Sequence, residues 1–495
     1  MSTQLPSDNG RQTASGTKRA SLFHWFEQRT GLNKLLHEAL DEPIPGGARF
    51  AYIFGSGLLF IFLSQFITGI FLALYYVPSA DHAHVTVAYI TKVVAAGAFL
   101  RSLHVYGASA MVIIVLLHLS QTFLFGSYKG KRELLWVSGT VLFVLVMGMA
   151  FTGYLLPWDQ KAYFATAVGT NVASEVPIVG TFAKQLMRGG NQIGTLTLSR
   201  FFVMHVFYIP ALIFLFVAVH IYLFRKAGAA GPISENPIHP QQRTESFYPR
   251  QLVMDLAFAL LLVVALGFAA YFIPATLGPL ANPADTHFLP RPEWYYRPLF
   301  EWLKIWQGRG EFLRIVVVPG VIVALFVGLP FYDRRLERRP WRRPLAVGIF
   351  SLVFLALITL GAYSYYQDSH DKDVAQQLAQ QRQAEMEYMK APFKPQMASG
   401  SRLAAAGAAT SATDPAVAEG KKIFESHQCN ICHGDGAVGT AIAPKLIGIG
   451  SQFSEDQFHD LFIHPLPKME AGHMPHFTFS ADETKAIRAY LDSLQ

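Results

Sequence analysis

The chain has 495 residues, of which 52% are hydrophobic and only 15% charged, and its mean hydropathy is +0.28. These values exclude an ordinary soluble domain and place the chain in the membrane class. The formal net charge of +7 does not indicate a nucleic-acid partner, because the basic residues gather in alternate loops rather than on one face. Two cysteines in one short motif leave no pair for a structural disulfide.

The amino-terminal segment, residues 1–49, is polar and lacks the short apolar stretch of a cleavable signal peptide. Within it Trp25, Phe26 and Leu32 alternate with charged residues. This pattern predicts an amphipathic helix that lies on the cytoplasmic surface of the membrane.

Seven apolar stretches are long enough to cross a hydrocarbon core of ~30 Å, which takes about 20 helical residues. Lys and Arg gather in the amino-terminal segment and after the second, fourth and sixth spans, which marks this side as cytoplasmic. We therefore predict a multi-pass protein of the bacterial inner membrane, with its amino terminus in the cytoplasm and its carboxy terminus on the periplasmic side. The predicted spans are 51–77, 99–125, 134–156, 202–224, 252–273, 313–332 and 345–366.

Four histidines lie inside the second and fourth spans, where an ionisable side chain is costly and indicates function. His104 and His118 are fourteen residues apart, close to four helical turns and roughly 21 Å. His205 and His220 are fifteen residues apart. Two facing helices would therefore offer two bis-histidine sites at two depths, which is a path for electrons. The alternative is histidines that only hydrogen-bond a neighbouring helix.

Four glycines repeat the fourteen-residue interval, Gly55 with Gly69 in the first span and Gly139 with Gly153 in the third. A planar macrocycle between four helices requires missing side chains where its edges approach the backbone. The pattern predicts a dihaem four-helix bundle over residues 50–230, although glycines alone also serve helix packing.

Residues 367–414 are expected to link the last span to a compact unit over 415–495. The first part, 367–390, is rich in Asp, Gln and Glu and can form a helix, and the rest is rich in Pro, Ala, Gly and Ser.

The carboxy-terminal unit contains a c-type haem attachment motif, CNICH. Cys429 and Cys432 are expected to bind the haem covalently, and His433 to be its proximal axial ligand. A CxxC redox motif or a zinc half-site is the alternative. Met474 is favoured over Met469 as the second axial ligand, because the residues after it are similar to those of small cytochromes c. Covalent haem attachment takes place outside the cytoplasm, which agrees with the predicted topology.

Residues 20–366 resemble cytochrome b of the quinol–cytochrome c reductases. The resemblance rests on the sequence GYLLPWDQ at 153–160, which ends the third span, and on PEWY at 292–295. The fifteen-residue histidine interval and the seven spans are similar to the chloroplast-type branch, whose gene is normally split after the fourth helix. Here the second part, 231–366, is fused to the first. Ile53 stands where that branch has a cysteine for an extra haem, so we expect no such haem.

The resemblance implies roles for individual residues. His104 with His205 would hold the outer haem, and His118 with His220 the inner haem. Glu293 would accept a proton in an outer quinol pocket; its alternative role is to cap a helix or tether a loop. At the outer pocket the resemblance further implies Tyr295, Pro292, Trp294 and Trp158. Arg225 and Glu38 would lie at an inner quinone site, and Arg101 and Arg200 at haem propionates. Each of these four charged residues could instead be an interfacial charge.

We therefore expect an all-α membrane protein with seven transmembrane helices, including the dihaem bundle, plus a small all-α cytochrome c domain. Its expected cofactors are two haem b and one covalently bound haem c. The expected function is that of a cytochrome b–c subunit of a quinol:cytochrome c oxidoreductase. Quinol is oxidised at the outer site; one electron crosses two b haems to an inner quinone site, the other reaches the c haem, and proton translocation is coupled to both transfers.

The expected partners follow from what the chain lacks. A Rieske iron–sulfur protein must carry electrons to the c haem, because no cysteines remain for its cluster. The membrane quinone pool, a cytochrome c or terminal oxidase, and a second copy in a homodimer are also expected. The chloroplast-type features fit menaquinol or plastoquinol, and ubiquinol is a further alternative. The alternatives are a non-bifurcating dihaem quinol dehydrogenase anchor and a haem-based sensor. The PEWY motif argues against both, because neither needs an outer quinol pocket.

Overall fold

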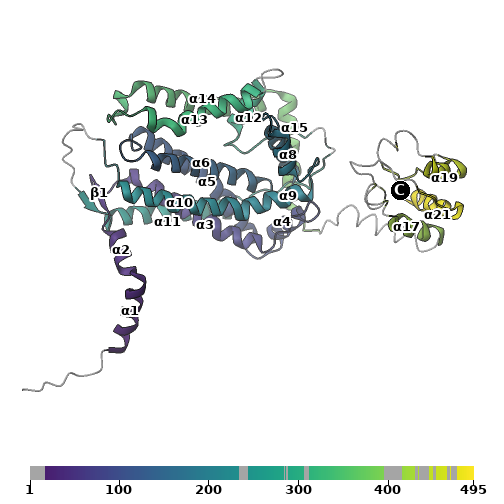
Figure 1. The fold of residues 1–495 in the computed structure, drawn as a ribbon, viewed down its shortest axis with the longest axis horizontal. Helices are drawn as coiled ribbons and strands as arrows, with labels where there is room; N and C mark the ends of the chain where they lie inside the picture. Colours follow the sequence, from purple (N-terminus) through teal and green to yellow (C-terminus); the bar gives the residue numbers. More distant parts are fainter. Residues whose placement is uncertain are drawn as a thin grey trace, which may run out of the picture.

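The computed structural model describes residues 17–233, 244–283, 285, 288–305, 312–394, 415–427, 429, 433, 437, 445–449, 453–464, 469 and 477–494. Nearly all regular structure in these ranges is helical (Figure 1). The helices before the midpoint of the chain are α1 (Thr17–Thr30), α2 (Leu32–Leu40), α3 (Ile53–Ala73), α4 (Ala83–Lys92), α5 (Gly97–Leu124), α6 (Glu133–Tyr154), α7 (Gln160–Ser174), α8 (Gly180–Arg188), α9 (Thr195–Val203) and α10 (Ile209–Ala227). Those after it are α11 (Arg250–Phe272), α12 (Arg297–Ile305), α13 (Val318–Tyr332), α14 (Pro344–His370), α15 (Lys372–Lys390), α17 (Pro415–Ser426), α19 (Glu455–Ile463) and α21 (Ala481–Ser493).

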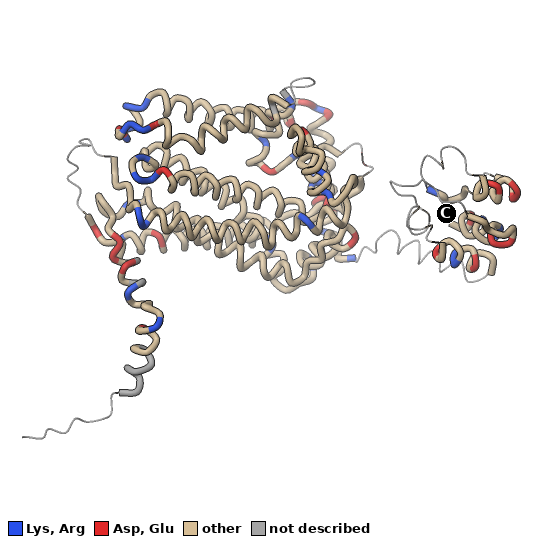
Figure 2. The backbone as a smooth tube through the Cα atoms, in the orientation of Figure 1, with Lys and Arg blue, Asp and Glu red and all other residues tan. Residues whose placement is uncertain are grey.

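Seven helical stretches of the described chain are long and apolar enough to cross a membrane, which confirms the predicted number of spans. Lys, Arg, Asp and Glu gather at the two ends of these helices, and few lie between (Figure 2). The protein is therefore an integral membrane protein. The stretches are Phe50–Ala73, Gly97–Leu124, Glu133–Tyr154, Thr195–Ala227, Arg250–Phe272, Ile315–Tyr332 and Pro344–His370.

The fourth span contains a π-helical turn, Met204–Tyr208, between α9 and α10. A π turn holds more residues than an α turn, and Pro210 just after it has no N–H to continue the α-helical bonds. The turn explains the unequal histidine intervals. Because one extra residue is taken up here, His205 and His220 both face α6 although they are fifteen residues apart.

The first four spans form a bundle in which α3 packs on α5 and α6 packs on α10. Its centre is apolar, with Ile61, Met111 and Ile213 among the buried residues. Helix α11 packs outside it against α3 and α5, and α13 packs against α6. At one end, strand β1 (Pro43–Pro45) pairs antiparallel with β2 (Thr244–Ser246), which joins the amino-terminal segment to the start of the fifth span.

The stretch 367–390 is helical: α14 continues to His370, and α15 begins after Asp371, whose carboxylate caps it by accepting the N–H groups of Asp373 and Val374. Beyond it, α17, α19 and α21 form a separate unit with its own core (Figure 1). There α17 and α21 cross so closely at Gly420 that a Cβ atom at this position would clash with the backbone carbonyl of Ala486. This helical unit agrees with the small all-α domain predicted at the carboxy terminus.

Candidate functional site

His104 and His205 face each other near one end of the bundle. His104 lies on α5 and His205 on the π turn, and the centroids of their rings are 6.3 Å apart. Gly69 on α3 borders His104, since a Cβ atom there would lie 3.3 Å from its Cε1 atom. Gly153 on α6 lies so close to His205 that a Cβ atom would clash with the ring. The structure thus brings the predicted outer pair together between two glycines.

His118 and His220 form the corresponding pair at the other depth, close enough to interact electrostatically. Gly55 on α3 borders His118, with a hypothetical Cβ atom 3.7 Å from the Cε1 atom of that ring. Gly139 on α6 borders His220, at 3.2 Å by the same measure. Each of the four predicted glycines therefore lies against one of the four histidines.

Three of the four imidazoles contact a hydroxyl group through Nδ1. Each hydroxyl donates its single hydrogen to a carbonyl of its own helix, so it can only accept a hydrogen bond from the imidazole. The Nδ1 atom therefore carries the ring proton, and Nε2 keeps its lone pair, which is the form in which an imidazole can bind a metal ion. The pairs are Thr68 Oγ1 with His104 (2.9 Å), Ser138 Oγ with His220 (2.9 Å) and Thr152 Oγ1 with His205 (3.1 Å).

His118 differs, because its buried Nδ1 has no hydrogen-bond partner within the described ranges. The sequence contains a signal for this difference that the spacing argument missed. A hydroxyl residue precedes three of the bordering glycines, whereas Phe54 precedes Gly55. Glycine-bordered imidazoles that present Nε2 from two helices fit a b-type haem at each pair.

The two arginines proposed at haem propionates have different surroundings. Arg101 is buried, and its guanidinium donates to the carbonyls of Ala275 (2.9 Å) and Thr276 (2.7 Å). It therefore ties the start of α5 to the loop after α11. Arg200 is exposed and contacts the carbonyl of Leu196 at 3.5 Å.

The PEWY segment, 292–295, lies against the end of α6 that carries Gly153. The hydroxyl of Tyr296 donates to the carbonyl of Met147 at 2.6 Å, and the hydroxyl of Tyr154 donates to that of Arg291 at 3.4 Å. These contacts join the segment between α11 and α12 to the helix that borders His205. Glu293 is thereby placed at the same end of the bundle as the outer histidine pair.

The residues predicted to form a quinol pocket with Glu293 differ in exposure. Pro292 is half-buried and Trp294 is exposed. The ring centroids of Trp294 and Tyr295 are 5.3 Å apart. Trp158 is buried against Ala83 and Leu198, in the left-handed backbone conformation with a φ of 53°. Such a conformation is costly for a bulky residue and marks a tightly constrained turn.

Burial raises the pKa of the Glu293 carboxyl above its usual range. The charges of Asp159 and Glu385 act in the same direction, whereas those of Lys161 and Arg297 oppose it. Burial, aided by the charge of Glu293, also raises the pKa of Tyr295, so its phenol keeps its proton. The segment therefore combines a carboxyl group that readily takes a proton with a phenol that can donate a hydrogen bond.

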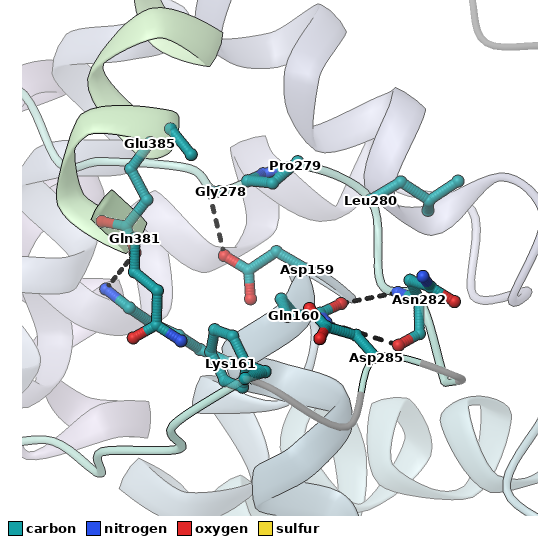
Figure 3. A pocket seen from close by; sticks show the side chains of 12 residues that line it. Asp159, Gln160, Lys161, Gly278, Pro279, Leu280, Asn282, Asp285, Gln381 and Glu385 are labelled. Atoms are coloured by element: carbon teal, nitrogen blue, oxygen red, sulfur yellow. Dashed lines mark hydrogen bonds and ion pairs between the residues drawn. The ribbon is translucent and has the colours of Figure 1, made fainter. Parts of the chain in front are cut away.

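A cavity of about 280 Å³, lined by both polar and apolar residues, lies at the start of α7 (Figure 3). Asp159 caps α7 by accepting the N–H of Ala162 at 3.0 Å, and it also accepts the N–H of Gly278 at 3.2 Å. Lys161 faces Glu385 of α15, with 2.7 Å between Nζ and Oε1. Asp159 and Gln160, the last two residues of GYLLPWDQ, both line the cavity. This sequence therefore contributes to the cavity in addition to ending the third span.

At the opposite end, Arg225 lies near the amino-terminal segment. Its Nη2 atom donates to the backbone carbonyl of Glu38 at 3.1 Å and lies 3.5 Å from the carboxylate of Glu42. The structure therefore brings the two predicted inner-site residues together. The contact uses the main chain of Glu38, and the carboxylate that faces Arg225 is that of Glu42, which sequence reasoning did not single out.

In the carboxy-terminal unit, Cys429 packs against the apolar core formed by α17, α19 and α21, and His433 is half-buried. Met469 is also half-buried. Cys432 and Met474 lie outside the described residues. The predicted haem c ligands can therefore be compared with the structure only at Cys429 and His433.

Comparison with known proteins matches each part of the chain. The family model "Cytochrome b/b6/petB" matches residues 39–228, "Cytochrome b(C-terminal)/b6/petD" matches 280–381, and "Cytochrome C oxidase, cbb3-type, subunit III" matches 415–491. A cytochrome bc complex cytochrome b subunit of Chlorobaculum thiosulfatiphilum is 34% identical over 71% of this chain and 82% of its own length. A menaquinol:cytochrome c reductase cytochrome b subunit of Bacillus subtilis is 38% identical over 43% of this chain and 98% of its own.

A solved structure described as "Hyperthermophilic respiratory Complex III" matches with a TM-score of 0.62 and 25% identity, over 74% of this chain and 96% of that one. The family matches imply haem binding in both the membrane part and the carboxy-terminal unit. The chain belongs to the cytochrome b family of cytochrome bc complexes, with both parts of cytochrome b in one chain and a cytochrome c domain after them.

Proposed function

We propose that this chain is the cytochrome b–c subunit of a quinol:cytochrome c oxidoreductase that works by a Q-cycle. Quinol is oxidised at an outer site beside Glu293, one electron goes to an inner quinone site, and the other goes through a separate Rieske protein to the c domain. The observation that carries the proposal is the position of Glu293, a half-buried carboxyl group at the same end of the bundle as His104 and His205.

The histidine pairs would hold two b haems, with His104 and His205 outside and His118 and His220 inside. Cys429, Cys432, His433 and Met474 would hold a covalent c haem. When bound, these haems supply one-electron carriers at fixed positions. The chain contributes the protonated Nδ1 atoms that orient three of the imidazoles and the glycines that leave space beside all four.

Glu293 is the proposed proton acceptor at the outer site. Its carboxylate accepts the proton of a quinol hydroxyl, and its raised pKa makes it a stronger base for that transfer than an exposed carboxylate. Tyr295 remains a phenol and can donate a hydrogen bond to a quinone oxygen. Trp294 and Pro292 complete the segment beside the bound ring. Arg101 supports the pocket by holding the 275–276 main chain.

The inner quinone site is proposed next to Arg225, near the amino-terminal segment. The guanidinium is already paired with Glu42 and with the carbonyl of Glu38, so Arg225 would act with these partners rather than alone. The excess of Lys and Arg in the loops at this end supports a cytoplasmic position for it, with the outer site and the c domain on the periplasmic side of a bacterial inner membrane.

Oxidant-induced reduction of the b haems tests the proposal. The purified complex is reduced with quinol while an inhibitor blocks the inner site, and an oxidant pulse is then given. Transient reduction of the b haems is expected, because withdrawal of one electron through the Rieske branch forces the second into the other branch. If the oxidant only oxidises them, the chain conducts electrons directly to its own c domain instead.

The c haem ligand is tested separately. Met474→Ala is expected to alter the c-type absorbance, whereas Met469→Ala is expected to leave it unchanged. The reverse result would assign the axial position to Met469.

A further inference from the structure

The main chain that follows α10, residues 227–231, is held by two arginines from other parts of the bundle. Arg132, the N-cap residue of α6, donates to the backbone carbonyls of residues 227–229 at 3.1–3.4 Å. Arg338, between α13 and α14, donates to those of residues 230–231 at 2.6 and 3.0 Å. Five consecutive carbonyls thus accept hydrogen bonds from two guanidinium groups, and we call these two arginines with the five carbonyls the arginine clamp.

The arginine clamp joins the end of α10 to three further segments. Arg338 also donates from Nε to the carbonyl of Phe125, the C-cap residue of α5, at 3.1 Å. Pro232, the residue after the clamped carbonyls, packs on Gly46 of the amino-terminal segment, where a Cβ atom would clash with the proline ring. The path of the chain after α10 is therefore set by α5, by α6, by the loop between α13 and α14, and by the amino-terminal segment.

Neither arginine of the clamp forms an ion pair with a carboxylate in the part of the chain that the structure describes. The two acids of the loop between α13 and α14 are paired with other residues, Asp333 with Lys129 and Glu337 with Arg339, both at 2.7 Å. The guanidinium groups face main-chain carbonyls instead, and the carboxy-terminal end of a helix carries a partial negative charge. The clamp therefore brings two positive charges that no described carboxylate neutralises.

The arginine clamp lies next to the groups proposed for the inner site. Arg225 is only two residues before the first clamped carbonyl. His220 is seven residues before that carbonyl, which is about two turns or roughly 10 Å of helix. Arg132 is likewise seven residues before Gly139, the glycine that borders His220. The two charges therefore lie close to Arg225 and about two helical turns from the inner histidine pair.

We propose that Arg132 and Arg338 are positioning residues of the inner quinone site. By holding the carbonyls after α10, they fix the helix end from which Arg225 reaches the bound quinone. Their charges also favour the reduced form of the haem that His118 and His220 would hold, which draws electrons toward the inner site. The inference rests on the proposed function and deepens its inner half.

Four variants of the full chain in its membrane complex separate position from charge. Arg338→Gln and Arg132→Gln each remove a charge and its carbonyl contacts. Arg338→Lys keeps the charge, but an ammonium lacks the planar fork with which a guanidinium holds several carbonyls. Arg334→Gln is the matched control, because Arg334 lies in the same loop, is exposed, and donates to the carbonyl of Phe331 at 2.6 Å. The b- and c-type absorbance first establishes that each variant has assembled.

The first measurement is the rate at which a water-soluble naphthoquinone oxidises the reduced b haems while an inhibitor blocks the outer site. The half-saturating quinone concentration is expected to rise roughly tenfold in Arg338→Gln, Arg338→Lys and Arg132→Gln, because each loses hydrogen bonds that a charged group donates. Arg334→Gln should have the half-saturating concentration of the wild type.

The second measurement is a redox titration of the b haems, which reports the charge. A unit charge at roughly 10 Å, with an effective dielectric constant of about 20, changes a one-electron equilibrium roughly tenfold. One b haem should therefore titrate about 59 mV lower in Arg338→Gln and Arg132→Gln. It should stay near the wild-type potential in Arg338→Lys and Arg334→Gln, and the other b haem should be unchanged throughout.

Recovery of the wild-type half-saturating concentration in Arg338→Lys would refute the positioning role, because charge alone would then suffice. Unchanged concentrations and potentials in assembled Arg338→Gln or Arg132→Gln would overturn the inference, as would equal changes in Arg334→Gln. If Arg338→Gln does not assemble, Arg338→Lys and Arg132→Gln make the same comparison. A wild type whose b haems the quinone cannot oxidise would refute the proposed inner site itself, so the two failures are distinguishable.

Discussion

Replacing Gly153 with alanine tests whether the histidine–glycine pairs border haem. Gly153 faces the ring of His205, and an added Cβ atom would lie 3.0 Å from its Nε2 atom and closer still to Cε1. That Nε2 atom is the one proposed to bind iron. The added methyl group must therefore displace either the imidazole or the edge of the macrocycle.

The structure sets the size of the effect. Overpacking of a tightly packed interior costs about 1–3 kcal/mol, and each 1.4 kcal/mol is a factor of ten in affinity. A fall of roughly 5- to 150-fold in affinity for the outer haem follows for Gly153→Ala. Gly139→Ala and Gly69→Ala, with hypothetical contacts at 3.2 and 3.3 Å, should be milder, and Gly55→Ala, at 3.7 Å, mildest.

The assay is a reduced-minus-oxidised difference spectrum combined with a redox titration. The c-type band of the same chain provides an internal standard for protein amount. Gly153→Ala should lose one b component selectively, and Gly139→Ala should weaken the other. Gly148→Ala is the control on the same helix, because among the described residues a Cβ atom there would meet only Ile209, at 3.9 Å.

Retention of both b components in Gly153→Ala would refute the reasoning, since the closest contact would then have no consequence. Equal loss in Gly148→Ala would refute it as well, because the effect would then come from α6 in general rather than from the histidine contact.

Three further predictions concern single side chains. Glu293→Gln should slow quinol oxidation by ~10²-fold or more. Because burial raises the pKa of Glu293, the wild-type rate should fall as the pH falls through that raised pKa. A pH–rate profile of the variant that still shows this fall would contradict the role of Glu293 as the proton acceptor. Ser138→Ala removes the hydroxyl that accepts the hydrogen bond of His220, and this bond makes the imidazole a stronger electron donor. The midpoint potential of one b haem should therefore rise by less than 59 mV, the shift that corresponds to about a tenfold change in the equilibrium constant of a one-electron reduction. The midpoint potential of the other b haem should stay unchanged in the same redox titration. Gly420→Ala should destabilise the c domain by about 1–3 kcal/mol, because the added Cβ atom would clash with Ala486. Thermal unfolding followed by c-haem absorbance measures this loss. An unaltered unfolding midpoint would show that the two helices cross less closely than described.

The π turn shows where the sequence pattern was informative but incomplete. The interval of fourteen residues indicated that His104 and His118 lie on one face of their helix, and the interval of fifteen that His205 and His220 lie on one face of theirs. An ideal helix turns by about 100° per residue, so the extra residue should rotate His220 away from the face of His205. Only the π turn at Met204–Tyr208 shows how the additional residue is taken up, because it depends on hydrogen bonding around Pro210.

The hydroxyl groups at Nδ1 illustrate a second limit. Thr68, Ser138 and Thr152 are ordinary helix residues by composition, and their pairing with histidines depends on how α3 and α6 face their neighbours. Glycine spacing in the sequence located the positions, but the partner of each glycine was set by helix packing. The same applies to Arg101, whose loop contacts join residues more than 170 positions apart.

The features that the sequence by itself determined are those that depend on the chemistry of residues close together in the chain. Runs of about 20 apolar residues, buried histidines and the CNICH motif each reflect a requirement that few other patterns satisfy, so the spans, the haem chemistry and the c domain could be predicted. The position of α15 against the start of α7 could not be predicted. Gln381, Glu385 and Lys161 look like solvated polar residues in the sequence. Only tertiary packing, in which Tyr388, Lys92 and Leu277 dock the helix, brings them to one cavity.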